Sequence, residues 1–172
     1  EGWEIVRWEM PIRGEVEGVR IRGKIDRVDR HRQTGMVRLL DYKTADNGKT
    51  PEAAHLGSAA GQGEWPEYAL VEVDGKKRRW TDLQVPLYAV LLSSDPELRG
   101  PFELGYFNLP KALDETGIVL WEGVSAALLQ SADACARGVI RDIKSRRFWP
   151  PAQKTRNDAF ESLFATDPAL CV

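Results

Sequence analysis

Residues 19–44 read VRIRGKIDRVDRHRQTGMVRLLDYKT. Over the first eight residues, apolar and charged side chains alternate, which is the period-two pattern of a β-strand with two different faces. One face carries Val19, Ile21, Gly23 and Ile25, and the other carries Arg20, Arg22, Lys24 and Asp26. The alternation changes phase at Val28, as happens at a β-bulge or a strong twist. A polar turn closed by Gly35 leads into a second strand over 36–44, so the stretch predicts a β-hairpin.

The hairpin places acidic and basic side chains together. A turn centred at residues 33–34 puts Asp26 opposite Asp41, with cross-strand Cβ atoms roughly 5 Å apart. A one-residue bulge at Gly35 would shift this pairing, unless the phase change after Asp26 compensates for the shift. We expect this compensation, so that Asp26 stays opposite Asp41. Lys43 shares a face with Asp41, roughly 7 Å further along the strand.

Two neighbouring carboxylates and a lysine suit metal-assisted phosphodiester hydrolysis. Carboxylates this close repel each other unless a cation lies between them, and Mg²⁺ is bound by few carboxylates while it keeps several waters. A lysine beside the ion can stabilise developing negative charge or hold the attacking water. The alternative is an ion-pair network of Asp26, Asp41 and Lys43 on a solvated sheet face.

Three segments in order resemble the motifs of RecB-type nucleases in the PD-(D/E)XK superfamily. They are GKIDRVD at 23–29, LLDYKT at 39–44 and DLQVPLYA at 82–89, and the resemblance covers about residues 15–92. The aromatic and proline segment at 148–151 is similar to the C-terminal domain of AddB-like helicase–nuclease subunits. The resemblance implies an α/β (α+β) fold with a restriction-endonuclease-like core, in which helices flank a mixed central β-sheet.

The same resemblance implies the site. The metal would be Mg²⁺ or Mn²⁺, and its ligands would be Asp26, Asp41 and the backbone carbonyl of Tyr42. Catalysis would involve Asp26, Asp41, Lys43 as the catalytic lysine, and the Gln-x-x-x-Tyr pair Gln84 and Tyr88. Spacing by four residues also puts this pair on one helix face, independently of the family. Many relatives carry a His or Glu on a helix before the first motif, and the mostly strand-like residues before Asp26 predict no such helix here.

The basic residues predict DNA contacts only locally, because the net charge of −2 gives no bulk attraction to nucleic acid. One group of candidates lies on the strand that carries Asp26 and comprises Arg20, Arg22, Lys24, Arg27 and Arg30. A second run comprises Lys76, Lys77, Arg78 and Arg79. The second run is equally well explained as a solvated hairpin tip.

The 172 residues predict a single domain over 1–172, with an insertion at about 45–80. The chain starts directly on a strand-like pattern, so we expect it to be a fragment of a larger protein. No apolar run approaches the roughly 18 residues of a membrane span, and we expect a cytoplasmic protein without a membrane partner. Relatives with an iron–sulfur cluster use four cysteines; Cys135 and Cys171 predict free thiols and no cluster.

Together these features predict a Mg²⁺-dependent DNA nuclease, with exonuclease action favoured by the resemblance, that acts in repair or recombination. DNA is the expected partner, and a helicase domain or subunit of the same system is a further candidate partner. One alternative is a catalytically impaired nuclease-fold module that binds DNA or serves as a scaffold. A second alternative is a purely structural domain.

Overall fold

The computed structural model describes residues 2–60, 65–98 and 101–148. The chain forms two compact units, residues 1–141 and 142–172, and the site described below lies in the first. In chain order, the helices and strands of the described residues are β1 (Trp3–Val16), β2 (Val19–His31), β3 (Val37–Lys43), α1 (Pro51–His55), β4 (Leu56–Ser58), the 3₁₀ turn η1 (Glu67–Ala69), β5 (Leu70–Val73), β6 (Lys76–Trp80), α2 (Gln84–Leu92), β7 (Phe102–Asn108), the 3₁₀ turn η2 (Leu113–Glu115), β8 (Gly117–Leu120) and α3 (Ala126–Lys144).

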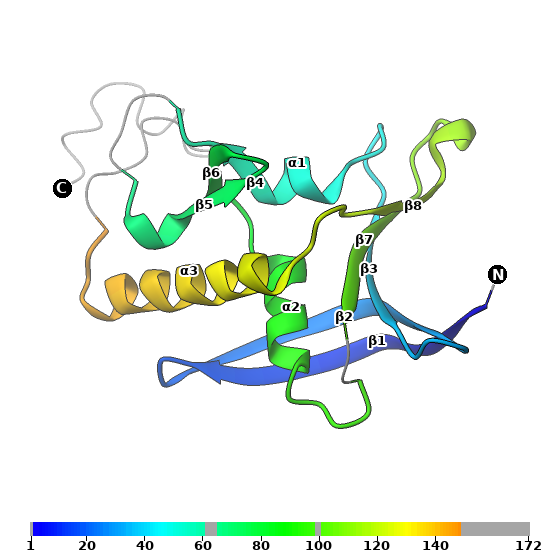
Figure 1. Ribbon diagram of the computed structural model, residues 1–172, viewed down its shortest axis with the longest axis horizontal. Helices are drawn as coiled ribbons and strands as arrows, with labels where there is room; N and C mark the ends of the chain where they lie inside the picture. The colour runs from blue at the N-terminus through cyan, green and yellow to red at the C-terminus, as the bar shows by residue number, and fades with distance from the viewer. Residues whose placement is uncertain (1, 61–64, 99–100, 149–172) are drawn as a thin grey trace, which may run out of the picture. The chain divides into compact units, whose positions relative to one another are not determined.

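A five-stranded sheet in the order β1-β2-β3-β7-β8 organises the fold (Figure 1). The pair β3 and β7 is parallel and the other pairs are antiparallel, so the sheet is mixed. The helix α2 lies beside β1, β3 and β7. This is the predicted α/β (α+β) class, a mixed central β-sheet flanked by helices, and it is consistent with a restriction-endonuclease-like core. None of the described helices combines the length and apolar character needed to cross a bilayer.

The first hairpin, β1–β2, turns at Glu17 and Gly18, whose φ angles are 51° and 75°. Two consecutive positive φ values are typical of a type I′ turn, which matches the right-handed twist of the strands it joins. β1 continues past Pro11 to Val16. β1 is an edge strand, where the missing amide hydrogen of proline interrupts no ladder.

The second hairpin, β2–β3, has the predicted register. Arg27 pairs with Leu40 and Arg30 with Val37, and the same register carried one residue further places Asp26 beside Asp41. The phase change at Val28 has its counterpart on the partner strand, because the register of β1 shifts between Ile5 and Arg7. An irregularity in β1 therefore accompanies the change of face in β2.

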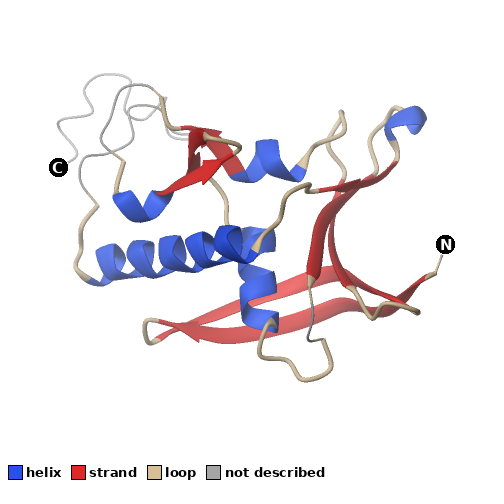
Figure 2. Ribbon diagram, in the orientation of Figure 1, coloured by secondary structure: helices blue, strands red, loops and turns tan. Residues whose placement is uncertain are grey.

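The segment between β3 and α2 forms structure of its own, including a small antiparallel sheet in the order β4-β6-β5 (Figure 2). The β5–β6 hairpin turns at Asp74 and Gly75, whose φ angles are 50° and 69°. The helix α1 and the strand β4 were not apparent from the sequence pattern. They matter because α1 carries His55 into the interior.

The long helix α3 begins after Ser125, whose hydroxyl oxygen accepts a hydrogen bond from the Leu128 amide at 3.1 Å. Its buried stripe includes Ala132, Ala136 and Cys135, the last of which is 4% exposed. Cys135 is a free thiol, as predicted. Cys171 and most of the 148–151 segment lie outside the described residues.

Candidate active site

Asp41 and Lys43 occupy alternate positions of β3 and share one face. The Lys43 Nζ lies 2.5 Å from Asp41 Oδ2. Asp41 is only 6% exposed, and the Lys43 side chain is 24% exposed. A charge-assisted contact in such partly dehydrated surroundings is stronger than a surface ion pair. The flexible lysine stem thus brings its charge closer to the carboxylate than the spacing along the strand.

The second oxygen of Asp41 is held by α2. Gln84 Nε2 donates to Asp41 Oδ1 at 2.9 Å. Gln84 is the first residue of α2, and its own amide donates to Asp82 Oδ1 at 2.7 Å. Asp82 therefore accepts from the first amide of the helix, although it lies two residues before the helix begins. Asp41 is therefore oriented from two sides.

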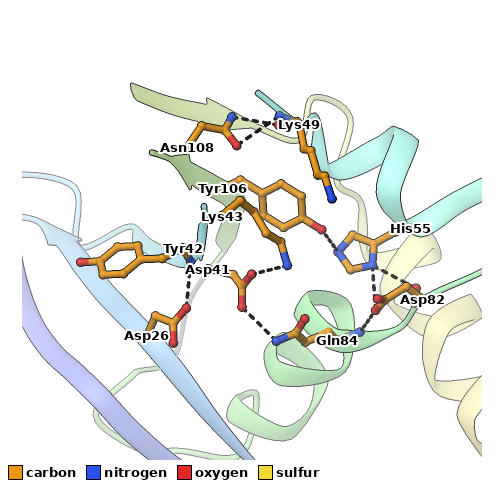
Figure 3. A network of polar contacts seen from close by, with 10 residues as sticks. All are labelled: Asp26, Asp41, Tyr42, Lys43, Lys49, His55, Asp82, Gln84, Tyr106 and Asn108. Carbon is orange, nitrogen blue, oxygen red and sulfur yellow. Dashed lines mark hydrogen bonds and ion pairs between the residues drawn. The ribbon is translucent and has the colours of Figure 1, made fainter. Parts of the chain in front are cut away.

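Asp26 lies on β2 next to the last pair of the β2–β3 ladder. Its Oδ2 accepts a hydrogen bond from the Tyr42 amide at 2.8 Å. Figure 3 shows Asp26 turned toward this amide and Asp41 turned toward Lys43 and Gln84. The structure thus brings the predicted residues Asp26, Asp41, Tyr42, Lys43 and Gln84 together at one place on the sheet.

A buried histidine, which the sequence did not identify as part of the site, supports this arrangement. His55 is fully buried, and its Nδ1 lies 3.0 Å from the Asp82 carbonyl and 3.3 Å from Asp82 Oδ1. A carbonyl oxygen only accepts, so Nδ1 carries the proton; in neutral imidazole Nε2 then accepts from the Tyr106 hydroxyl, 3.0 Å away. The imidazole also stacks on Trp121, with planes within 2° of parallel.

These contacts form one connected network around Asp41 and Lys43 (Figure 3). Tyr106 is the β7 neighbour of Asp41, and Lys43 Nζ lies over its ring, 4.6 Å from the centroid. Burial, together with the charges of Asp82 and Asp41, raises the pKa of Tyr106 above its ordinary value. The hydrogen bond from His55 lowers the pKa of the Asp82 carboxyl. Tyr106 is thus a neutral donor and Asp82 an ionised acceptor at neutral pH.

No local pattern predicts this role of His55. Its partners Asp82 and Tyr106 lie 27 and 51 residues away in the sequence. The only available signal was a histidine among apolar neighbours in a segment with no regular periodicity. Such a signal does not distinguish a buried network from a surface side chain.

Tyr88, the second residue of the Gln-x-x-x-Tyr pair, lies against the first motif. Its ring occupies the space in front of Gly23, where an added Cβ would come within 2.6 Å of Tyr88 Cε1. Glycine is therefore required at the start of the GKID segment for the ring to pack there. The contact fixes α2 against β2 three residues before Asp26.

The predicted DNA-binding residues fall into two groups. Several are engaged within the chain: Arg27 binds the buried Asp29 through two hydrogen bonds of 2.7 and 2.9 Å, Arg30 donates to the Glu97 carbonyl, and Arg78 and Arg79 donate to carbonyls of β4. The exposed ones are Arg20, Arg22, Lys24, Lys76 and Lys77.

The donor set fits a hard divalent cation. Asp26 and Asp41 supply carboxylate oxygens, and each oxygen keeps a further lone pair beside its present hydrogen bond. Mg²⁺ is held by one or two carboxylates with several waters, so two suffice. Among the described residues, no group of three or more His, Cys, Asp or Glu side chains is placed to hold a metal.

Comparisons with known proteins agree with the motif resemblance. The sequence model of the PD-(D/E)XK nuclease superfamily matches residues 1–163. A crystal structure of a "Putative exonuclease" from Eubacterium rectale aligns with 94% of this chain at 12% identity, with a TM-score of 0.43. This chain spans 57% of the length of that protein, and a likeness at this TM-score carries no argument about function. No curated protein matches the chain significantly.

Proposed function

Because this chain belongs to the PD-(D/E)XK nuclease superfamily, we propose that it is a divalent-metal-dependent DNA nuclease domain. The observation that carries the proposal is the constellation at the end of β3. Lys43 lies 2.5 Å from Asp41, Gln84 holds the other oxygen of Asp41, and Asp26 projects from the adjacent strand. A network this specific is more than a solvated ion pair, because Asp41 is buried and held on both sides.

In this proposal Asp26, Asp41 and the carbonyl of Tyr42 hold Mg²⁺ or Mn²⁺. The ion would polarise the scissile phosphate and lower the pKa of a bound water. Lys43 holds the attacking water or stabilises the extra negative charge of the transition state. Gln84 keeps Asp41 in one orientation, and Tyr88 keeps α2 seated against β2 beside Asp26.

The biological setting follows the motif resemblance. We propose exonuclease action on DNA in repair or recombination, next to a helicase domain or subunit of an AddB-like system. A concrete check is to measure degradation of linear against covalently closed circular DNA. An exonuclease degrades only the linear form.

A second candidate function has its own supporting observation. Both oxygens of Asp41 are already engaged, and the described residues offer no third carboxylate or imidazole at this place. A domain in which Lys43 permanently neutralises Asp41 would bind DNA without cutting it. This is the impaired module that binds DNA or serves as a scaffold.

Cleavage separates the two functions. Purified protein with Mg²⁺ or Mn²⁺ is expected to degrade linear DNA, and Lys43→Ala is expected to abolish cleavage while DNA binding remains. Lys111→Ala is the matched control, because Lys111 is an exposed lysine that ion-pairs with Asp46 and has no contact with the site residues. Salt-sensitive binding with no cleavage under any metal would establish the second function instead.

Metal binding can be measured without activity. Mn²⁺ is expected to raise the melting temperature of the wild-type protein but not that of Asp26→Asn, because a ligand that binds only the folded state stabilises it. An equal melting temperature with and without Mn²⁺ in both proteins would favour a purely structural domain.

A further inference from the structure

The β1–β2 hairpin extends well beyond the part of the sheet to which it belongs. β2 pairs with β1 along its whole length, from Val19 to His31, but pairs with β3 only from Arg27 to Arg30. Residues 10–25 therefore form a two-stranded arm that projects past β3 (Figure 2). Asp26 lies at the point where this arm joins the sheet.

One face of the arm is covered by helices. Space for a side chain at Gly14 is filled by Leu91, and at Gly23 by Tyr88, both from α2. Val16 packs with Ile140 of α3. This face therefore has no room for a ligand.

The opposite face is exposed and basic. Directly opposed residues in an antiparallel pair point to the same side, and Arg13 is opposed to Arg22 while Glu15 is opposed to Arg20. The next even position of β2 puts Lys24 on this face as well, and Asp26 follows where the arm joins the sheet.

The arginines of this face lack acidic partners among the described residues. Lys24 pairs with Glu9, and Glu17 at the tip of the arm pairs with Arg137 and Arg141 of α3. None of the ion pairs found among the described residues involves Arg13, Arg20 or Arg22. Like charges directly opposite each other destabilise a strand pair. A bound anion would therefore relieve the repulsion between Arg13 and Arg22.

We infer that Arg13, Arg20 and Arg22 form a binding track for the phosphate backbone of the DNA, along which the strand reaches Asp26. The inference rests on the proposed function, because it takes the scissile phosphate to be the one beside Asp26. Positions two apart on a strand are about 7 Å apart, so Arg22 lies roughly 14 Å and Arg20 roughly 20 Å from Asp26. At about 3.4 Å per nucleotide in duplex DNA, the track covers roughly four to six nucleotides beyond the cut.

Counterion release gives the expected size of the effect. Each phosphate neutralised by a basic side chain contributes about 0.9 to the slope of log K against log salt concentration in duplex DNA. Removing two such contacts with Arg13→Gln/Arg22→Gln should lower that slope by about 1.8 and weaken binding roughly 60-fold at 0.1 M salt. Both residues are exposed, so the fold should be retained.

The experiment measures the affinity of the whole chain for linear duplex DNA across a salt series, in a Lys43→Ala background that prevents cutting. The matched control is Arg7→Gln/Arg32→Gln, which removes the same charge from β1 and from the turn that follows β2. These two arginines already pair with Glu97 and Glu4. The track variant should lose affinity and slope, and the control should lose neither.

A second readout uses the length of the substrate. With otherwise wild-type protein, Arg13→Gln/Arg22→Gln should reduce kcat/KM on long DNA but not on substrates with fewer than about four nucleotides beyond the cut, which do not reach the track. A simple folding defect would lower both equally.

Each outcome is decisive for one of the two hypotheses. An unchanged affinity and slope, an equal loss in the control, or no DNA binding by any form of the protein would overturn the track. If DNA binds through Arg13 and Arg22 but the parent protein never cuts it, the track stands and the proposed nuclease activity fails. If the parent cuts and the variant matches it at every length, the activity stands and the track fails.

Discussion

Replacing His55 with phenylalanine tests whether the hydrogen bonds of this buried histidine stabilise the network of contacts around Asp41. Phenylalanine keeps an aromatic ring stacked on Trp121 but provides no partner for Tyr106 or Asp82. The perturbation is therefore restricted to hydrogen bonds. Because His55 is fully buried, water cannot easily replace what is lost.

The magnitude follows from the groups left without partners. A buried hydroxyl without a partner, here that of Tyr106, costs about 1–3 kcal/mol, and the hydrogen bond to the Asp82 carbonyl adds about 1 kcal/mol. The carboxylate of Asp82 is nearly half exposed and is left out of the sum, because water can solvate it. His55→Phe should thus destabilise the protein by about 2–4 kcal/mol.

A double-mutant cycle with Tyr106→Phe isolates the His55–Tyr106 contact. Tyr106→Phe alone should cost about 1–2 kcal/mol, since it leaves Nε2 of His55 without a partner. In the double variant neither group remains, so its cost should fall short of the sum of the single costs by about 1–2 kcal/mol. Urea denaturation with an unchanged m-value gives each free energy of unfolding.

Two results would refute the reasoning. Costs that add to within about 0.5 kcal/mol would mean that the two side chains are not coupled. A control substitution, His31→Phe, changes a histidine near the surface that contacts Trp3 and accepts from the Thr34 amide. It should cost less than about 1 kcal/mol. An equal loss of unfolding free energy in both histidine variants would show that the buried hydrogen bonds of His55 contribute no more to stability than the contacts of His31.

Three further predictions concern single positions. Gly23→Ala should destabilise the protein by about 1–3 kcal/mol because its Cβ would meet the Tyr88 ring, whereas Gly117→Ala, with open space around it, should be nearly neutral in the same urea titration. Because the pKa of Asp82 is lowered by folding, its carboxylate stabilises the fold above the unfolded-state pKa near 3.8, and this contribution is lost as the pH falls through the lower folded-state pKa. Asp82→Asn should therefore flatten the acid side of a plot of stability against pH. Burial raises the pKa of the Cys135 thiol to about 11, so alkylation at neutral pH, followed in a variant lacking the other cysteine, should be slow until denaturant is added.

The basic residues show what limits the prediction of DNA-binding residues from the sequence. Arg20 and Arg27 are equally basic, and the sequence assigns both to DNA binding. In the structure Arg27 is bound to a buried aspartate, whereas Arg20 lies on the open face of the arm. Charge is visible in a sequence, but whether a charge is already satisfied depends on the partner that folding brings to it.

The sequence alone predicted the β2–β3 hairpin, its register and the close approach of Asp26, Asp41 and Lys43. This was possible because two-residue periodicity and turn chemistry act over a few residues, and because a register error would turn every side chain to the wrong face. Only the tertiary structure decided that His55 supports Gln84 through Asp82 and that the first hairpin is a projecting arm. Those features join segments tens of residues apart, and the burial and hydrogen bonding that stabilise them exist only once the sheet and α2 have packed together.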